Sequence, residues 1–461
     1  MPSRQLSNIE RYFYNRRKLG LHSCFYLAVK FNRQIDDNHL SYALKETINE
    51  FPQLHSNVFN DETFERIEPI TVTIHFKDVV SFLEEEELSE DLINKIFKTV
   101  KFNYNEHEVL WRLLVLKNRC TFILCVDHVL FDGMSTVKFW EKFIGALNND
   151  EPKDDDKILH FHSSIVPNLP PHPYDLIPIS FKWILIRWLI RIILALGMFP
   201  YRQEISGKQF RLPGYSFPSG LFERNCNTQT IRNDNRQVKL HICNNGLTFL
   251  LSQCKRHNVS LTSMFVATII YSLRSNRPAS ARGTLLKIDL PMNTRVQMER
   301  ELNLNLAQLD MGNYIKNGEL TYDLSQTEGI WNIAKDINEQ IDAKKNDFES
   351  INMIKLLDFA DNEKLIREKT KAKYPGSTFE VTNLGSQSFQ SSIDDKFYIV
   401  NALFNEPQSI SDIFTFSLVS SSVGGLNCCI SCPKDIFDEL NPTFNYMKEI
   451  LKEYSSPVTT E

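Results

Sequence analysis

The chain has 461 residues, about three times the most common length of a single domain, so two domains are the first expectation. Its 57 Asp and Glu residues outnumber its 52 Lys and Arg residues, and the net charge of -5 leaves no broad basic surface for a nucleic-acid backbone. With 42% hydrophobic residues and 32 Phe, the composition is that of a folded protein rather than a disordered one. We therefore expect packed cores and no nucleic-acid partner.

The cysteine pattern favours neither disulfides nor a metal site. The tightest cluster, Cys428, Cys429 and Cys432, lacks a second pair at ligand spacing and lies in a strand-like run. Residues 1–17 are polar and contain no apolar core of signal-peptide length. We expect free thiols in a reducing compartment, no bound metal and a chain that begins in the cytosol.

Hydrophobic periodicity predicts the elements of the first part of the chain. Leu40, Leu44 and Ile48 recur at helical spacing, whereas residues 70–76 alternate between apolar and polar as a half-buried strand does. The predicted elements, in chain order, are a helix over 38–50, a strand over 70–76, an acidic helix around 84–99, a hairpin of strands 109–116 and 121–126, and a helix over 134–147.

A polar, proline-rich stretch then divides the chain. Residues 148–157 are acidic and polar, and Pro167, Pro170, Pro171, Pro173 and Pro178 follow closely. Proline fixes φ and lacks an N–H donor, so regular structure is disfavoured there. We predict an N-terminal domain over 1–160, a linker with an amphipathic segment over 161–225 and a C-terminal domain over 226–461.

Residues 181–199, FKWILIRWLIRIILALGMF, are almost continuously apolar and about as long as a minimal membrane span. Arg187 and Arg191 fall on one face of a helix, which opposes insertion across a bilayer. Trp183 and Trp188 suit a boundary between water and lipid. A helix in the membrane interface is the preferred interpretation. A helix buried between domains with paired arginines, and a true span, remain as alternatives.

The C-terminal part continues with alternating periodic segments. The predicted elements are a strand over 237–243, helices over 247–256 and 261–274, a strand over 285–290, a helix over 331–344, a strand around 378–382, paired strands 413–420 and 426–432, and a closing helix over 437–454.

The sequence HVLFDG at residues 128–133 lies on the turn between a predicted strand and a predicted helix. A histidine that leaves a strand edge can project into a cleft, where a neutral imidazole is suited to take a proton from a hydroxyl or an amine. His128 is therefore a candidate general base, although a histidine beside a turn can equally hydrogen-bond a carbonyl. Asp132 is a candidate turn-stabilising partner, and Gly133 permits backbone geometry that other residues resist.

At this HxxxDG motif the chain resembles the coenzyme-A-dependent acyltransferases that include chloramphenicol acetyltransferase and the plant HxxxDG enzymes. It is more similar to the fungal alcohol acetyltransferase family, including a yeast N-acetyltransferase branch that acts on sphingoid-like amines. The DFGWG box of the plant enzymes is absent. The further supporting segments, in order, are NIERYFYNRRKLGLHSCFYLAVKF, FPQLHSNVF, VLWRLLVL, LPMNTR, MGNYI and FEVTNLG.

The resemblance implies an α/β (α+β) fold of two chloramphenicol-acetyltransferase-like domains, with mixed sheets, flanking helices and an active site in the channel between them. His128 would be the base for direct acetyl transfer, and Asp132 would orient its loop through an arginine, with Arg295 as the candidate. Thr382 or Asn383 would stabilise the oxyanion. Both also fit a turn that follows a strand.

The same resemblance implies acetyl-CoA as co-substrate and a lipophilic alcohol or amine as acceptor. We expect peripheral association with the cytoplasmic side of the endoplasmic reticulum membrane or with lipid droplets, with a role in lipid metabolism or detoxification. A non-catalytic lipid-binding or peripheral membrane protein that retains the fold is the alternative. Thioesterase-like hydrolysis is a further option.

Overall fold

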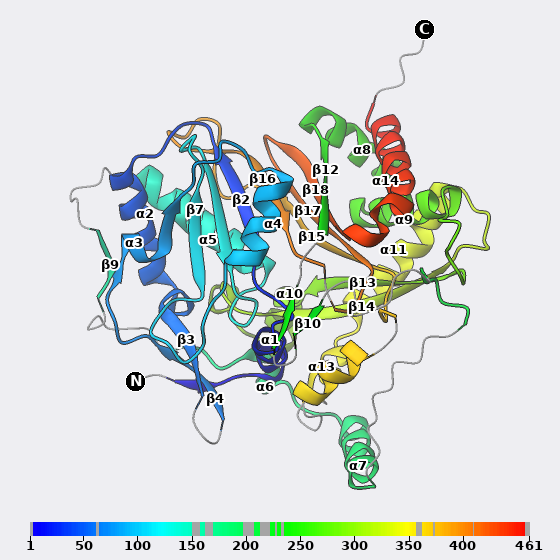
Figure 1. The fold of residues 1–461 in the computed structure, drawn as a ribbon, viewed down its shortest axis with the longest axis horizontal. Helices are drawn as coiled ribbons and strands as arrows, with labels where there is room; N and C mark the ends of the chain where they lie inside the picture. The colour runs from blue at the N-terminus through cyan, green and yellow to red at the C-terminus, as the bar shows by residue number, and fades with distance from the viewer. Residues whose placement is uncertain are drawn as a thin grey trace.

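Two mixed β-sheets with flanking helices organise the chain (Figure 1). The computed structural model describes residues 3–60, 64–149, 157–161, 169–196, 207–212, 222–225, 228–231, 235–355, 362–371, 374–408 and 410–456. The five-stranded sheet has the order β16 (Ile399–Asn405), β2 (Phe25–Phe31), β8 (Thr121–Val126), β7 (Trp111–Val115) and β6 (Val80–Phe82). The six-stranded sheet has the order β12 (Asn235–Ile242), β18 (Gly425–Pro433), β17 (Phe414–Ser421), β15 (Phe379–Gln387), β13 (Leu285–Asn293) and β14 (Ile315–Asp323).

The remaining strands form small sheets, and the helices cover the large ones. The small sheets are β1 (Arg4–Gln5), β4 (Glu65–Pro69) and β3 (Ser56–Asn60); β5 (Ile74–His75) and β9 (Ile158–His160); and β10 (Phe222–Asn225) and β11 (Thr228–Ile231). The helices are α1 (Asn8–Lys18), α2 (Asp37–Glu50), α3 (Phe76–Val79), α4 (Glu90–Thr99), α5 (Gly133–Asn149), α6 (Pro173–Leu176), α7 (Phe181–Ala195), α8 (Asn244–Arg256), α9 (Leu261–Ser275), α10 (Arg295–Leu302), α11 (Ile330–Asn346), α12 (Asn352–Lys355), α13 (Asn362–Lys371) and α14 (Lys434–Tyr454).

The central strands are buried on both faces, which explains their continuous apolar runs. Every residue of β17 and β18 is buried, and so is every residue of β8 after Thr121. The helix α5 packs against the five-stranded sheet, and its Trp140 donates a hydrogen bond from the indole to the carbonyl of Leu27 in β2 (3.2 Å). The predicted hairpin is confirmed as the antiparallel pair β7 and β8, and the predicted helix after it is α5.

The predicted strand over residues 70–76 is wrong for most of its length. Only Ile74–His75 forms a strand, β5, which pairs with β9. The next residue begins α3, because the carboxylate of Asp78 accepts a hydrogen bond from the backbone N–H of His75 (3.0 Å). This cap satisfies a helix N-terminus that an alternating pattern does not reveal.

Helix α1 is fixed at its start by a reciprocal cap. The hydroxyl of Ser7 accepts from the backbone N–H of Glu10, and the carboxylate of Glu10 accepts from the N–H of Ser7 (2.8 Å). Glu10 also forms a buried ion pair with Arg4. These contacts hold α1 in the orientation that brings Phe13 and Arg16 to the functional cavity described below.

Strand β16 comes from the C-terminal part of the chain but belongs to the five-stranded sheet of the N-terminal part. It pairs antiparallel with β2, in a register that places Phe404 opposite Leu27. The two parts of the chain are therefore joined by backbone hydrogen bonds as well as by side-chain packing. The domain limits predicted at residues 160 and 225 stay predictions.

Helix α7 covers residues 181–195 of the predicted amphipathic segment and stands apart from the sheets (Figure 1). Of the side chains in α7 that the structure describes, none is buried, and Phe181 is 74% exposed and Trp188 59% exposed. The alternative of a helix buried in the described part of the protein is therefore wrong. Among the described helices, none is long and apolar enough to cross a membrane. Residues 197–199 of the segment lie outside the described residues.

Candidate active site

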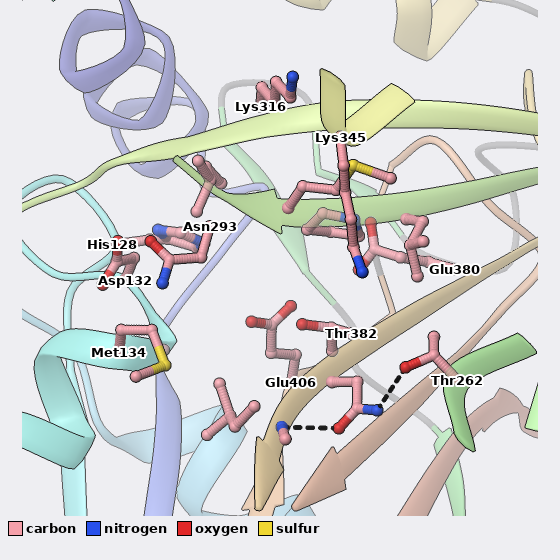
Figure 2. A pocket seen from close by; sticks show the side chains of 18 of the residues that line it. His128, Asp132, Met134, Thr262, Asn293, Lys316, Lys345, Glu380, Thr382 and Glu406 are labelled. Atoms are coloured by element: carbon pink, nitrogen blue, oxygen red, sulfur yellow. Dashed lines mark hydrogen bonds between the residues drawn. The ribbon is translucent and has the colours of Figure 1, made fainter. Parts of the chain in front are cut away.

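A cavity of about 600 Å³ is lined by residues that both large sheets position (Figure 2). His128 follows β8 of the five-stranded sheet, whereas Thr382 and Asn383 belong to β15 of the six-stranded sheet. The structure thus brings together the predicted base and the predicted oxyanion residues, which are more than 250 positions apart in sequence. Their catalytic roles stay predictions.

The imidazole of His128 is held by aromatic and amide side chains. Its ring stacks on Phe13 at a centroid distance of 3.8 Å and an interplanar angle of 17°, and the ring of Phe25 lies 4.9 Å away. The side-chain amide of Asn313 donates to the backbone carbonyl of His128 (2.7 Å), and its nitrogen lies 3.3 Å from Nδ1 of the ring. Asn313 belongs to the MGNYI segment, so that segment supports the histidine loop directly.

Burial, together with the nearby positive charge of Arg16, lowers the pKa of His128 to about 3. The imidazole is therefore uncharged at physiological pH. An uncharged imidazole that lines a cavity is in the form that accepts a proton. The charge state and the location of His128 both fit a general base.

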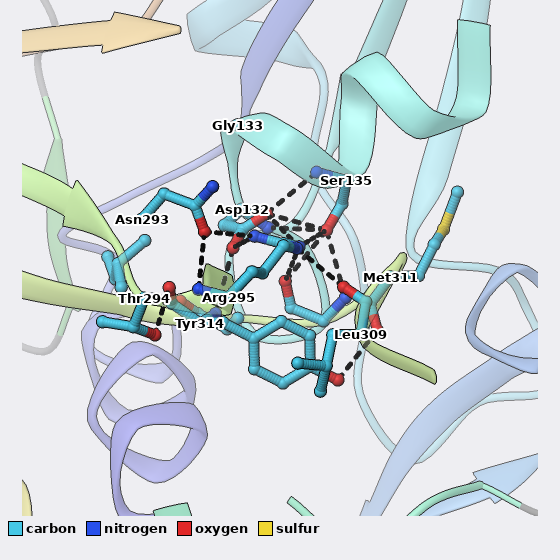
Figure 3. A network of polar contacts seen from close by, with 12 residues as sticks. Asp132, Gly133, Ser135, Asn293, Thr294, Arg295, Leu309, Met311 and Tyr314 are labelled. Atoms are coloured by element: carbon cyan, nitrogen blue, oxygen red, sulfur yellow. Dashed lines mark hydrogen bonds and ion pairs between the residues drawn. The ribbon is translucent and has the colours of Figure 1, made fainter. Parts of the chain in front are cut away.

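Asp132 points into a buried polar network rather than toward the reacting space (Figure 3). Its carboxylate receives two hydrogen bonds from the guanidinium of Arg295 (2.7 and 3.0 Å), one from the backbone N–H of Tyr314 (3.0 Å) and two from Ser135. Burial alone raises the pKa of Asp132, but the Arg295 ion pair and these hydrogen bonds hold it below the ordinary value. The contact with Arg295 that the resemblance implied is present, and the role of Asp132 in orienting the histidine loop stays a prediction.

Gly133 lies at a close contact between elements, which differs from the role that its residue type suggested. Its φ is not among the positive values of the chain, so a special backbone geometry does not explain the glycine. A Cβ atom at this position would lie 2.3 Å from Cδ2 of Leu384, in the TNLG segment. Gly133 therefore allows the N-terminus of α5 to approach β15 closely.

The two candidate oxyanion residues differ in the hydrogen bonds that their side chains make. The side-chain amide of Asn383 donates to the hydroxyl of Thr262 (3.0 Å), and its carbonyl accepts from the N–H of Gly385 (2.8 Å). The hydroxyl of Thr382 has no hydrogen bond to any residue that the structure describes, and it faces the cavity (Figure 2). Thr382 is therefore the better placed donor. The turn after a strand that the sequence also allowed is not observed, since β15 continues to Gln387.

Sequence reasoning missed several ionisable side chains of the cavity. Arg16 belongs to α1, His22 lies between α1 and β2, Glu380 belongs to β15 and Glu406 directly follows β16. Burial holds the pKa of His22 well below the ordinary value, with smaller contributions from Arg16 and His128. The segments that carry Arg16, His22 and Glu380 were recognised through the resemblance, but no local pattern marks these positions. In the described part of the chain no group of His, Cys, Asp and Glu side chains is arranged to hold a metal ion.

Replacing Asp132 by Asn should destabilise the protein by about 3–5 kcal/mol, because it leaves the buried guanidinium of Arg295 without its counter-charge. The free energy of unfolding in urea measures this loss. Glu50→Gln, which removes an exposed ion pair with Lys142, is the control and should cost at most about 1 kcal/mol. Equal losses for the two variants would contradict a structural role for Asp132.

The imidazole of His128 should stay uncharged from pH 8 down to pH 5, because burial and Arg16 disfavour the protonated ring. Its ¹⁵N chemical shifts in histidine-labelled protein, assigned with His128→Gln, measure the charge directly. The urea-unfolded protein is the reference, since its histidines titrate near about 6.5. A titration midpoint between pH 6 and 7 in the folded protein would show that the ring is not desolvated.

The comparisons with known proteins agree with this geometry. A family model for alcohol acetyltransferase matches residues 5–454. The N-acetyltransferase SLI1 of Saccharomyces cerevisiae is 36% identical over 98% of this chain and 99% of its own length. An uncharacterized protein of Schizosaccharomyces pombe is 24% identical over 96% of this chain and 93% of its own length.

Solved structures share the fold at low identity. The trichothecene 15-O-acetyltransferase TRI3 from Fusarium sporotrichioides superposes with a TM-score of 0.67 at 11% identity, over 97% of this chain and 95% of its own. The first condensation domain of the CDA synthetase gives a TM-score of 0.58 at 12% identity, over 100% and 99% of the two chains. These neighbours confirm the expected two-lobed α/β architecture. The family match and the relative at 36% identity together show that this chain is an acetyltransferase and belongs to the alcohol acetyltransferase family.

Proposed function

We propose that the protein transfers an acetyl group directly from acetyl-CoA to the hydroxyl or amine of a lipophilic acceptor, with His128 as the general base. The observation that carries this proposal is the uncharged His128 ring on the wall of a cavity that both sheets line. A base of this kind removes the proton of the attacking oxygen or nitrogen as the new bond to the thioester carbonyl forms. The proton then passes from the imidazole to the departing thiolate, and no acyl-enzyme is formed.

The oxyanion of the tetrahedral intermediate needs a hydrogen-bond donor in a site without water. We assign this part to the hydroxyl of Thr382, which faces the cavity and has no other described partner. Asn383 supports the strand through Thr262 and Gly385. Asp132 and Arg295 act through the loop geometry alone.

The phosphates of acetyl-CoA require cations, and the wall formed by α10, β14 and α11 provides them. Lys345 lines the cavity, and its amine points into the open space (Figure 2). Lys316 lies nearby, but its amine already donates hydrogen bonds to the backbone carbonyls of Lys344 and Asp347. We propose Lys345 as a phosphate contact, with Arg300 at the same wall.

Both kinds of acceptor are represented among the relatives. SLI1 carries the name N-acetyltransferase, and the TRI3 structure is that of an O-acetyltransferase. A single base serves either acceptor, because each loses a proton from the attacking atom.

We propose further that α7 lies in the interface of a membrane, on the cytoplasmic side of the endoplasmic reticulum or on lipid droplets. Exposed apolar side chains along α7, among them Leu185, Leu189 and Ile192, support this placement. Lys182 and Arg191 add positive charge beside the two tryptophans, with which they make cation–π contacts. A membrane-bound enzyme would meet a lipophilic acceptor where that acceptor is most concentrated.

His128→Ala should reduce acceptor-dependent release of the coenzyme-A thiol by about 10²-fold or more while the protein stays folded, since a base contributes that much to the rate. The assay uses acetyl-CoA with isoamyl alcohol, a sterol and a sphingoid base. His107→Ala, at an exposed histidine, is the control. Equal release by wild type and His128→Ala would contradict the base assignment, and a protein that does not bind acetyl-CoA would favour the non-catalytic lipid-binding alternative.

Replacing Ile184, Leu185, Leu189 and Ile193 by Gln should weaken binding to anionic vesicles by about 10-fold or more, because their apolar area no longer leaves water. Vesicle flotation measures binding, and thermal unfolding should be unchanged. Gln at Leu251 and Ile393, two exposed apolar residues elsewhere, is the matched control. A loss of folding in the α7 variant, or equal flotation of both variants, would argue against the membrane interface.

A further inference from the structure

Three ionisable side chains on the cavity wall have no hydrogen-bond or ion-pair partner among the described residues, although Arg16 lies over the rings of Tyr12 and Phe13. The guanidinium of Arg16 and the carboxylates of Glu380 and Glu406 line the same space as His128. None of the three makes a hydrogen bond or an ion pair through its side chain with any residue that the structure describes, although Arg16 is only 8% exposed. Burying a charged group without a partner costs free energy. The presence of three such groups at one cavity therefore points to a ligand that forms ion pairs or hydrogen bonds with them.

Two further carboxylates lie behind the cavity wall, close to Glu380 and Glu406. Glu380 in β15 lies in register with Asp289 of β13, and the buried Asp412 precedes β17. The positive charge of Arg16 lowers the pKa of both Glu380 and Glu406, and that of Lys369 lowers the pKa of Asp289. Among these described side chains, the four carboxylates outnumber the two cations.

Burial and neighbouring negative charges favour the protonated forms of Glu380 and Glu406. Burial raises the pKa of Glu406, Asp412 raises it further, and Arg16 opposes both. Burial also raises the pKa of Glu380, together with the negative charges of Asp412, Glu406 and Asp289. A cationic ligand would replace these protons, because it supplies the missing positive charge inside the cavity.

The geometry agrees with a ligand at this point. Figure 2 shows the carboxylate of Glu406 in the open middle of the cavity, beside Thr382 and across from the His128 ring. The backbone N–H of Glu406 donates to the hydroxyl of Ser417 (3.0 Å), which fixes the position of the residue at the end of β16. A group held by Glu406 would therefore lie between the proposed base and the proposed oxyanion donor.

We propose that Glu380 and Glu406 bind the ammonium group of a primary-amine acceptor and that Glu406 takes its first proton. This inference rests on the proposed function and specifies the acceptor class of the same site. An alcohol carries no charge and gains much less from two carboxylates than an ammonium does. The site therefore favours N-acetylation over O-acetylation.

The proposed steps balance in atoms and charge. The ammonium gives one proton to Glu406 and becomes a neutral amine, whose lone pair forms the N–C bond with the thioester carbonyl. The C–S bond then breaks. The second proton passes from the nitrogen to His128 and on to the thiolate, which leaves the N-acetyl amide and coenzyme A, and Glu406 releases its proton to solvent. Two proton acceptors are needed because an amine that binds as an ammonium must lose two protons.

The test compares octylamine with 1-octanol, a matched amine and alcohol, as acceptors for acetyl-CoA. We expect wild type to prefer octylamine, and Glu406→Gln and Glu380→Gln to lower kcat/KM for octylamine by about 10- to 100-fold. Their effect on 1-octanol should be less than about 3-fold, since an alcohol does not use the ion pair. Glu449→Gln, at an exposed carboxylate of α14, is the control.

A pH profile separates proton transfer from simple packing. In wild type the acid limb of kcat/KM for octylamine should report the Glu380–Glu406 pair, and in Glu406→Gln it should move. Should Glu406→Gln fail to fold, Glu406→Asp keeps the charge and shortens the side chain. A drop for octylamine without a drop for 1-octanol then supports the proposal, and equal drops overturn it.

The outcomes distinguish this inference from the proposed function. His128-dependent transfer that favours 1-octanol, or octylamine kinetics unchanged in both Gln variants, would overturn the ammonium site and leave the acetyltransferase assignment intact. Absence of His128-dependent transfer to either acceptor would overturn the proposed function itself.

Discussion

The buried ion pair between Asp132 and Arg295 is the interaction on which the rest of the site depends. Asp132 ends the loop that carries His128, and Arg295 begins α10, immediately after β13 of the other sheet. The guanidinium also donates to the backbone carbonyl of Leu309, and Tyr314 contacts the same carboxylate. One ion pair thus fixes the histidine loop, the LPMNTR segment and the MGNYI segment relative to one another. Loss of either charge would leave the other buried alone.

The cavity uses burial in two opposite ways. For His128, desolvation disfavours the protonated ring and keeps the imidazole uncharged. For Glu380 and Glu406, desolvation among like charges raises the pKa and favours the protonated forms. Burial thus favours the uncharged form of both kinds of group, the imidazole and the carboxyls. The positive charge of Arg16 links the two kinds of group, because it lowers the pKa of the histidine and of both carboxyls.

Local sequence patterns predicted the parts of the molecule that local physics determines. The hairpin of β7 and β8 and the helix α5 follow from hydrophobic period and turn chemistry, and the HxxxDG motif pointed to the cavity. Strand pairing is not local, so the place of β16 beside β2 left no signal. The same holds for Arg16, Glu380 and Glu406, which meet only after three distant segments have packed. The backbone geometry expected of Gly133 is wrong, and its close approach to Leu384 is a tertiary contact that no local pattern reveals.

Because β16 comes late in the sequence but pairs with β2, the order of synthesis affects the five-stranded sheet. Until residue 405 has left the ribosome, one edge of β2 has no partner in the five-stranded sheet, although the other four strands of that sheet lie within the first 126 residues. At about 5–20 residues per second, this edge waits for tens of seconds with its N–H and C=O groups available to other chains. The N-terminal part cannot complete its largest sheet by itself. Protection of this edge by a chaperone would therefore determine the yield of native protein.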